Sequence, residues 1–137
     1  MNPESAFALL AAIRAHLLAD AGVAAAVGPR IYDVAPLGVV FPYIQTGDIQ
    51  SLPFEDGMCI NGSELFITIH TWARGQTPAA DMHRANAAVR FALHGQTFAV
   101  AGHTLQAMDF QTTRTLRDPD GITRHGVVDF RAFTTAA

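Results

Sequence analysis

Apolar residues recur along the chain with two periods, one typical of helices and one typical of strands. Residues 3–19 follow the helical period, and one broad face is expected to hold Phe7, Leu9, Leu10, Ile13 and Leu17. Asn2 is the expected N-cap of this helix, with Pro3 in its first turn. A shorter helical segment is expected to follow and to close at Gly28 and Pro29.

A second main helix is predicted for residues 78–94, where the apolar positions form a narrower stripe. This core stripe consists of Met82, Ala85, Val89, Ala92 and Leu93. The polar side is expected to carry His83, Asn86, Arg90 and His94. Phe91 falls on the side opposite Met82, so it provides apolar surface that the predicted core stripe does not use.

The clearest strand is predicted for residues 64–73, where apolar and polar side chains alternate. Leu65, Ile67 and Ile69 point to one face, while the other face is amphipathic and carries Phe66, Thr68, His70 and Trp72. Shorter strands are expected at residues 30–33 and 43–49, and a small hairpin at residues 96–105. Residues 50–58 are predicted to form an exposed, mobile loop that presents Phe54.

Two long strands, at residues 105–117 and 122–133, are predicted to form a C-terminal hairpin. The connecting sequence DPDG has Asp at the first, Pro at the second and Gly at the fourth position, which is typical of a type I turn. The apolar face is lost towards the tip, so the tip is expected to project and to need a partner to order it. Its charged residues are Arg114, Arg117, Asp118, Asp120 and Arg124.

The predicted order of elements indicates an α+β fold. One helix separates two groups of strands, and the remaining strands are connected by hairpins. We therefore expect a mixed or antiparallel sheet, with two main helices packed on one face and a long projecting C-terminal β-hairpin. The 137 residues suit a single domain spanning residues 1–137.

Composition excludes several classes of function. The chain has a net charge of −3 and a pI near 6.0, which argues against a non-specific nucleic-acid binder. All nine basic residues are arginine, so a Walker-type phosphate loop and a Schiff-base mechanism, which both need lysine, are excluded. With one cysteine, the chain cannot form an internal disulfide.

No motif points to an active site or a metal centre. The six histidines lack zinc-binding spacing, and His83 and His94 lie three helical turns apart. Gly62-Ser63-Glu64 lacks the second glycine of a nucleophile elbow. Cys59 has no evident base beside it. We therefore predict no catalytic residue, no metal and no cofactor.

Three segments, read in order, carry a family resemblance. They are RIYDVAPLGVVFPYIQTGD at residues 30–48, ITIHTWAR at residues 67–74 and TTRTLRDPDGITRHGVVDFRAFT at residues 112–134. In this order and spacing they resemble the tail-terminator, or tail-completion, family of tailed phages and of phage-derived gene transfer agents. The resemblance runs from Arg30 to the C-terminus, and the leading helix fits it as well.

The resemblance implies a structural role in the tail of a virion or phage-like particle assembled in the bacterial cytoplasm. Such proteins form a ring, usually hexameric, that caps the head-proximal end of the tail tube and ends its polymerisation. The implied partners are other copies of the chain, the tail tube protein and a head-side connector or stopper. DNA passes through the lumen without sequence-specific binding, and no membrane is involved.

The contact surfaces expected for this role come from the residues themselves. The hairpin at residues 112–125 and the loop at residues 50–58 are predicted to make axial or neighbouring-subunit contacts, with Arg114, Arg117 and Arg124 foremost. Phe54, Phe91 and Trp72 provide apolar surface for subunit contacts.

Three alternatives remain open on sequence grounds. The first is another head–tail component, such as a connector, stopper or minor tail protein. The second is a small α+β enzyme or ligand-binding domain that uses His70, His83 or Cys59. The third is a generic dimeric scaffold.

Overall fold

The part of the chain that the structure describes folds into three helices and five strands. The computed structural model describes residues 4–56 and 59–137. Its elements, in chain order, are α1 (Ala6–Ala19), α2 (Ala21–Val27), β1 (Ile31–Tyr32), β2 (Tyr43–Asp56), β3 (Cys59–Ala73), α3 (Pro78–Leu93), β4 (His103–Arg117) and β5 (Arg124–Ala136). The predicted α+β class is confirmed.

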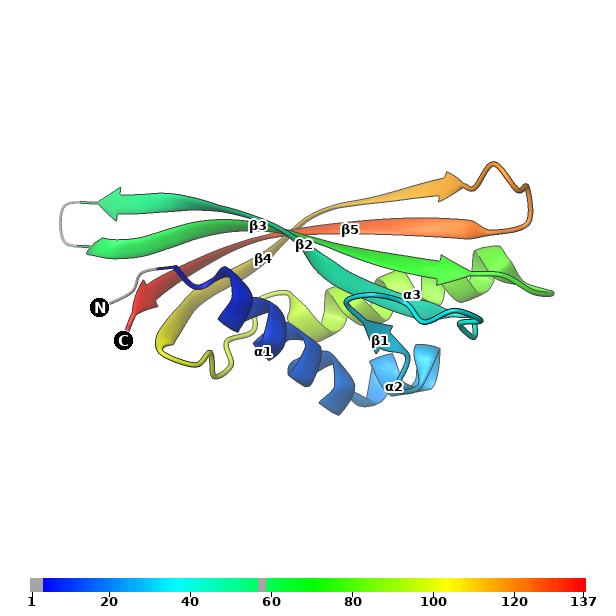
Figure 1. The fold of residues 1–137 in the computed structure, drawn as a ribbon, viewed down its shortest axis with the longest axis horizontal. Coiled ribbons are helices and arrows are strands. Elements are labelled where there is room, and N and C mark those ends of the chain that lie inside the picture. Colours follow the sequence, from blue (N-terminus) through cyan, green and yellow to red (C-terminus); the bar gives the residue numbers. More distant parts are fainter. Residues whose placement is uncertain (1–3, 57–58) are drawn as a thin grey trace.

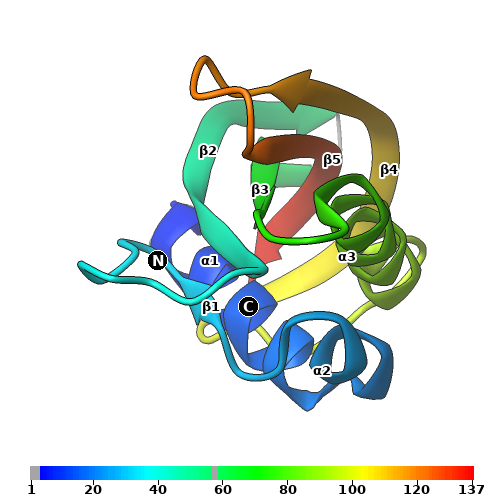
Figure 2. The ribbon, with the colours of Figure 1, turned by 90° about the vertical axis from the view of Figure 1, so that its right-hand side faces the viewer.

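The strands form one sheet in the order β1-β2-β3-β5-β4. Only β1 and β2 run parallel, and the remaining pairs are antiparallel, so the sheet is mixed as predicted. The sheet is long and strongly twisted, and the helices pack against one of its faces (Figure 1). A view along the long axis shows the strands curling around the top of the helical layer (Figure 2).

The core lies between the sheet and the helices. Leu9, Ile13 and Leu17 of α1 are fully buried, and every residue of the predicted α3 stripe is buried as well. The sheet contributes the predicted inward face of β3, together with Phe130 of β5. The helical and strand periods therefore identified eleven of the buried hydrophobic residues, on α1, β3 and α3.

Helix α1 differs from the prediction at its start and on one face. It begins at Ala6, whose N–H donates to Glu4 Oε1 at 2.7 Å, while Asn2 and Pro3 lie outside the described residues. Phe7 is 86% exposed, so its predicted place in the core is wrong. The physical reason is its position two residues before Leu9, which at about 100° per residue turns it to the opposite side.

Strand β2 is twice as long as predicted. Residues 50–56 continue the strand and pair with β3, so the predicted mobile loop is wrong for this segment. Residues 57 and 58 lie outside the described part, as does the side chain of Cys59. Because β1 pairs only with Ile44 and Gln45, the rest of β2 has a free edge, and proline is tolerated in edge strands such as this one at Pro53.

Two further predictions need correction. The small hairpin at residues 96–105 is reduced to a single bridge between Val100 and His103. Asn86, predicted on the polar side of α3, is 5% exposed, and its Oδ1 accepts a hydrogen bond from Thr71 Oγ1 at 2.5 Å.

Among the described residues, no single helix is long and apolar enough to cross a membrane. Helices α1 and α2 together reach the length and apolar composition that a membrane span requires, but they are bent by 82° relative to each other.

Candidate assembly surfaces

The face of the sheet opposite the helices carries a continuous row of polar and aromatic side chains. Figure 1 shows that the three helices leave this face uncovered. We call it the open face and define it by Asp48, Phe54, Glu64, Thr68, His70, Trp72, His125, Asp129, Arg131 and Phe133. The predicted amphipathic face of residues 64–73 is therefore confirmed as a part of it.

One end of the open face is built on two stacked rings. Trp72 and His125 are direct partners on β3 and β5, and their ring centroids lie 3.8 Å apart at 6°. His125 Nε2 lies 2.7 Å from His70 Nδ1, and His70 Nε2 lies 2.6 Å from Asp48 Oδ2. When His70 donates to Asp48 and is neutral, its Nδ1 accepts the proton of His125 Nε2. This chain of contacts joins β2, β3 and β5.

The environment of His125 disfavours its charged form. Burial lowers the pKa of His125, and the neighbouring His70 and Arg114 lower it further, while Asp118 acts in the opposite direction. Burial also raises the pKa of Tyr43, which lies next to Trp72 on the same sheet, although Arg74 opposes that shift. Both groups are therefore neutral at pH 7.

Acidification is expected to destabilise the chain through His125. Its folded pKa lies below the unfolded value of about 6.5, so its stabilisation is complete above about pH 6.5 and is lost as the pH falls through the folded pKa. Thermal unfolding between about pH 7.5 and about pH 5 measures the effect, with fluorescence of the single tryptophan as the local reporter. His125→Gln is the control, and an unchanged pH dependence in it would contradict the assignment.

The middle of the open face is a small charge network. Asp129 accepts hydrogen bonds from Thr68 Oγ1 at 2.8 Å and from Thr112 Oγ1 at 3.1 Å. Arg114 Nη2 lies 3.6 Å from the same carboxylate. One predicted hairpin arginine is thus paired within its own sheet, where an exposed ion pair contributes about 0.2–1 kcal/mol.

The far end of the open face combines an ion pair with two phenyl rings. Arg131 forms an ion pair with Glu64, and its guanidinium lies 4.7 Å from the centroid of Phe133. Phe54 contacts Phe133 edge to face, with centroids 5.1 Å apart. Phe54 is therefore a half-buried residue of β2, where the sequence predicted a loop side chain.

The hairpin turn closes with the predicted hydrogen bond, and one of its two strands pairs with the body of the sheet almost up to the turn. Gly121 N donates to Asp118 O at 2.9 Å, as in a four-residue turn. The hairpin reaches one end of the sheet (Figure 1), yet β5 pairs with β3 as far as Ala73 and Arg124. Strand β3 therefore supports one arm of the hairpin up to Arg124, which the hairpin sequence could not show because strand register cannot be deduced from it.

Asp120 anchors the turn to the body of the protein. Its carboxylate accepts from Thr123 Oγ1 at 2.6 Å and from the N–H groups of Ile122 and Thr123, and it pairs with Arg74 at 3.2 Å. Arg74 Nε also donates to Thr123 Oγ1 at 2.9 Å. These contacts, with the Thr123 hydroxyl foremost, lower the pKa of Asp120 to about 2.

Replacing Asp120 is expected to loosen the turn without unfolding the sheet. Asp120→Ala removes the acceptor for four hydrogen bonds, so trypsin should cleave after Arg117 and Arg124 several-fold faster than in the unmodified chain. Asp118→Ala is the matched control, because its backbone, not its carboxylate, makes the turn hydrogen bonds. Equal cleavage rates in the two variants would contradict the anchoring role.

The remaining hairpin charges lie without ionic partners. Arg117 and Arg124 face each other across the hairpin, and neither forms an ion pair within residues 4–56 and 59–137. Two like charges in directly opposed positions destabilise a strand pair. A carboxylate of a partner placed near Arg117 and Arg124 would therefore stabilise this end of the hairpin.

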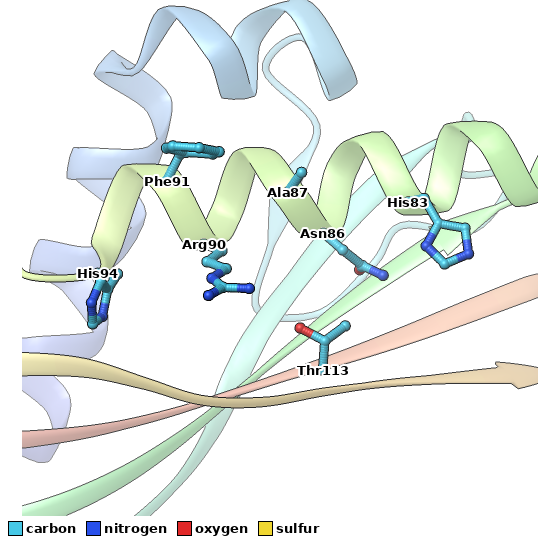
Figure 3. Close-up of a pocket in the computed structure, with 7 residues that line it drawn as sticks. All are labelled: His83, Asn86, Ala87, Arg90, Phe91, His94 and Thr113. Carbon is cyan, nitrogen blue, oxygen red and sulfur yellow. The ribbon is translucent and has the colours of Figure 1, made fainter.

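Phe91 lies apart from the open face, beside a groove between α3 and β4. It is 85% exposed, as predicted. The groove has a volume of about 510 Å³, and its lining is shown in Figure 3: His83, Asn86, Ala87, Arg90, Phe91, His94 and Thr113. Sequence periodicity predicted the polar helix positions but not that Thr113 of β4 would close the other side.

The histidines considered as catalytic or metal-binding residues do not converge. His70 is held by Asp48 and His125, whereas His83 and His94 line the α3–β4 groove. His94 Nδ1 accepts from Phe110 N at 3.0 Å. In the part of the chain that the structure describes, no three His, Cys, Asp or Glu side chains are placed to hold a metal ion.

Comparisons with known proteins agree in sequence and in fold. A family model described as "Tail completion protein gp17" matches residues 11–135. The tail completion protein gp17 of Bacillus phage SPP1 is 30% identical over 91 residues, a span of 66% of this chain and 66% of that protein, just under two thirds of its length. A chain in the solved structure titled "Virion of native gene transfer agent (GTA) particle" superposes with a TM-score of 0.87 and 28% identity, covering 96% of this chain and 98% of that one.

Proposed function

The chain belongs to the tail completion protein gp17 family, and on that premise we propose that it forms a ring that caps the head-proximal end of a tail tube. The family consists of structural tail proteins of virions, not enzymes. In the proposed role, the ring ends tube polymerisation and joins the tail to a head-side connector. DNA passes through its lumen, and assembly takes place in the bacterial cytoplasm.

The observation that carries this proposal is the nearly complete superposition on a chain of a gene transfer agent virion. The shape of the molecule supports it as well. Strand β2 ends and β3 begins at one end of the long axis, while the turn between β4 and β5 lies at the other end (Figure 1). An adaptor between two different partners needs two unlike ends, and here each end is a separate hairpin.

The charges fit a surface that binds partners by specific contacts. On the open face, Asp129, Glu64 and Asp48 are each matched with a basic or hydrogen-bonding side chain. Arg117 and Arg124, near the hairpin tip, form no ion pair among the described residues. We propose that the tip contacts the tube end or the connector, with Arg117 and Arg124 setting that contact and Phe54 and Trp72 belonging to the stable platform behind it.

Removing the protein from an assembling particle tests the function. We expect heads without tails and tubes of uncontrolled length, and supplying the chain from a second gene copy should restore joined particles. Normal particles in its absence would overturn the proposal.

The second candidate is a stopper or connector on the head side of the same junction. This alternative differs from the proposed role in where the chain lies along the particle, not in its chemistry. Finding the chain on tail-less heads, with tubes of normal length, would favour this alternative.

A further inference from the structure

A loop between β1 and β2 presents apolar side chains to solvent. Leu37 is fully exposed, Val34 is 79% exposed and Val40 is 62% exposed. We call these three residues the apolar loop. Three exposed aliphatic side chains on one short connection are unusual for a surface that stays in water.

The base of the apolar loop is held in place, so the side chains are presented on a fixed support. Arg30 Nε donates to Pro42 O at 2.8 Å, and Gln45 Nε2 donates to Asp33 O at 3.3 Å. The guanidinium of Arg74 lies 4.7 Å from the centroid of Phe41. A loop anchored at both ends loses little conformational freedom on binding, which favours its use as a contact.

The α3–β4 groove has the properties of a complementary surface. Phe91 and Ala87 lie along the outer side of α3, while Arg90 and Asn86 point towards β4 (Figure 3). The volume of about 510 Å³ is sufficient for aliphatic side chains of the size of leucine and valine. Phe91 provides the exposed apolar wall against which such side chains would pack.

A buried donor in the groove has no acceptor. Asn86 is only 5% exposed, and its Oδ1 accepts the hydrogen bond from Thr71 Oγ1. Its Nδ2 has no hydrogen-bond partner among the described residues. Because its own chain covers this atom, the donor lies behind the groove surface, and Phe91, Ala87 and Arg90 are the side chains that the groove offers to an incoming loop.

Charge also matches between the loop and the groove. Arg90 lies with its guanidinium 4.0 Å from the Phe110 centroid and forms no ion pair in the described part of the chain. Asp33, at the base of the apolar loop, is exposed and likewise has no ionic partner there. The groove therefore carries an unpaired positive charge at Arg90, and the loop carries an unpaired negative charge at Asp33.

The two surfaces lie on opposite sides of the molecule and at a similar level along its long axis. Figure 2 shows the loop before β2 projecting to one side, with α3 and β4 on the other. Figure 1 shows the loop and α3 in the same half of the long axis. Contacts between such surfaces place successive copies side by side without a step along that axis, which allows a ring to close.

We propose that the apolar loop of one copy occupies the α3–β4 groove of the next copy. The proposal rests on the ring proposed above and assigns its lateral contact. Leu37 packs on Phe91 and Ala87, and Asp33 pairs with Arg90. The long axis of each subunit then runs parallel to the ring axis, and the hairpin ends form the two axial surfaces.

Cross-linking within assembled particles tests this contact. The double variant Leu37→Cys with Ala87→Cys is treated with a short thiol-reactive spacer, and the products are separated under denaturing conditions. We expect a ladder of covalent multimers, because each copy links to the next in a head-to-tail contact. Both positions are on exposed side chains, so the substitutions should not disturb folding.

The controls isolate the proposed pair. The unmodified chain contains only Cys59, and each single variant adds one thiol, so any linkage through Cys59 is seen in these three samples. Leu37→Cys with Ala80→Cys places the second thiol on the same helix but outside the groove lining, and it should give a much weaker ladder.

The outcomes separate this interface from the proposed function. Particles that contain the chain at the tail end but give no ladder beyond the controls would overturn the interface and leave the function intact. A ladder in the Ala80 variant alone would also overturn it. Particles that lack the chain would remove the proposed function, and this interface with it.

Discussion

A chain with a shortened hairpin is expected to fold but to leave tails uncompleted. Replacing residues 118–123 with Asn-Gly joins Arg117 to Arg124 through a two-residue turn, which suits an antiparallel pair. The pairing of β5 with β3 up to Ala73 remains. The variant therefore retains the sheet, together with Arg117 and Arg124, and loses the projecting turn of the surface that we propose contacts the tube end or the connector.

The expected defect is large because few residues dominate most protein interfaces. Loss of one such contact costs about 2 kcal/mol or more, which weakens binding about thirtyfold, and a closed ring repeats the loss at every subunit. Electron microscopy of particles from cells that express the variant should show unjoined heads and tails of uncontrolled length.

A charge variant separates the shape of the tip from its electrostatics. Arg117→Gln with Arg124→Gln keeps the turn and removes the two opposed positive charges. We expect partial loss of joining, together with a weaker dependence of assembly on salt. Normal particles from the shortened variant would show that the tip makes no essential contact.

Adding a single methyl group at Gly126 is expected to cause the largest loss of stability. A Cβ built on this residue overlaps Asn86 Oδ1 and Thr71 Oγ1, the two atoms of a buried hydrogen bond between α3 and β3. Overpacking and the disturbed hydrogen bond together should cost about 2–4 kcal/mol in the free energy of unfolding. Denaturant unfolding of Gly126→Ala measures it.

The same substitution in another background provides the control. When Thr71→Ala and Asn86→Ala are already present, the obstructing atoms are gone and the new methyl group fills part of the space. Gly126→Ala should then be nearly neutral, since alanine is no worse than glycine in a strand. An equal loss in both backgrounds would place the cause in the backbone instead of the Thr71–Asn86 contact.

The sequence predicted the core well because periodicity reports which side of an element is buried. The inward residues of β3 and the stripe of α3 follow directly from alternation and from helical spacing. Helix α1 was harder, because it is apolar on most sides and its period does not single out one face. Phe7 was misplaced for this reason.

Periodicity could not predict the features that depend on pairing between segments far apart in the sequence. Pro53 and the acidic residues around it resemble a loop, and only the absence of a long neighbour on that side allows an edge strand there. The burial of Asn86 depends on the lack of a side chain at Gly126, forty residues later. The stacking of Trp72 on His125 depends on the register of β3 and β5.

Some features of the candidate surfaces could be predicted from local sequence, and others could not. The turn at Asp118 and the exposure of Phe91 followed from local sequence, and both are confirmed. The anchoring of Asp120 by Arg74 and the groove beside Phe91 required the fold. The assignment of these surfaces to partners stays a prediction.

The position of the chain in an intact particle tests the central claim most directly. A small tag on the C-terminal residue, imaged by electron microscopy of purified particles, locates the protein along the tail. The account predicts a single ring of density at the junction between tail tube and head. Density along the tube, at the distal tip or within the head would contradict it.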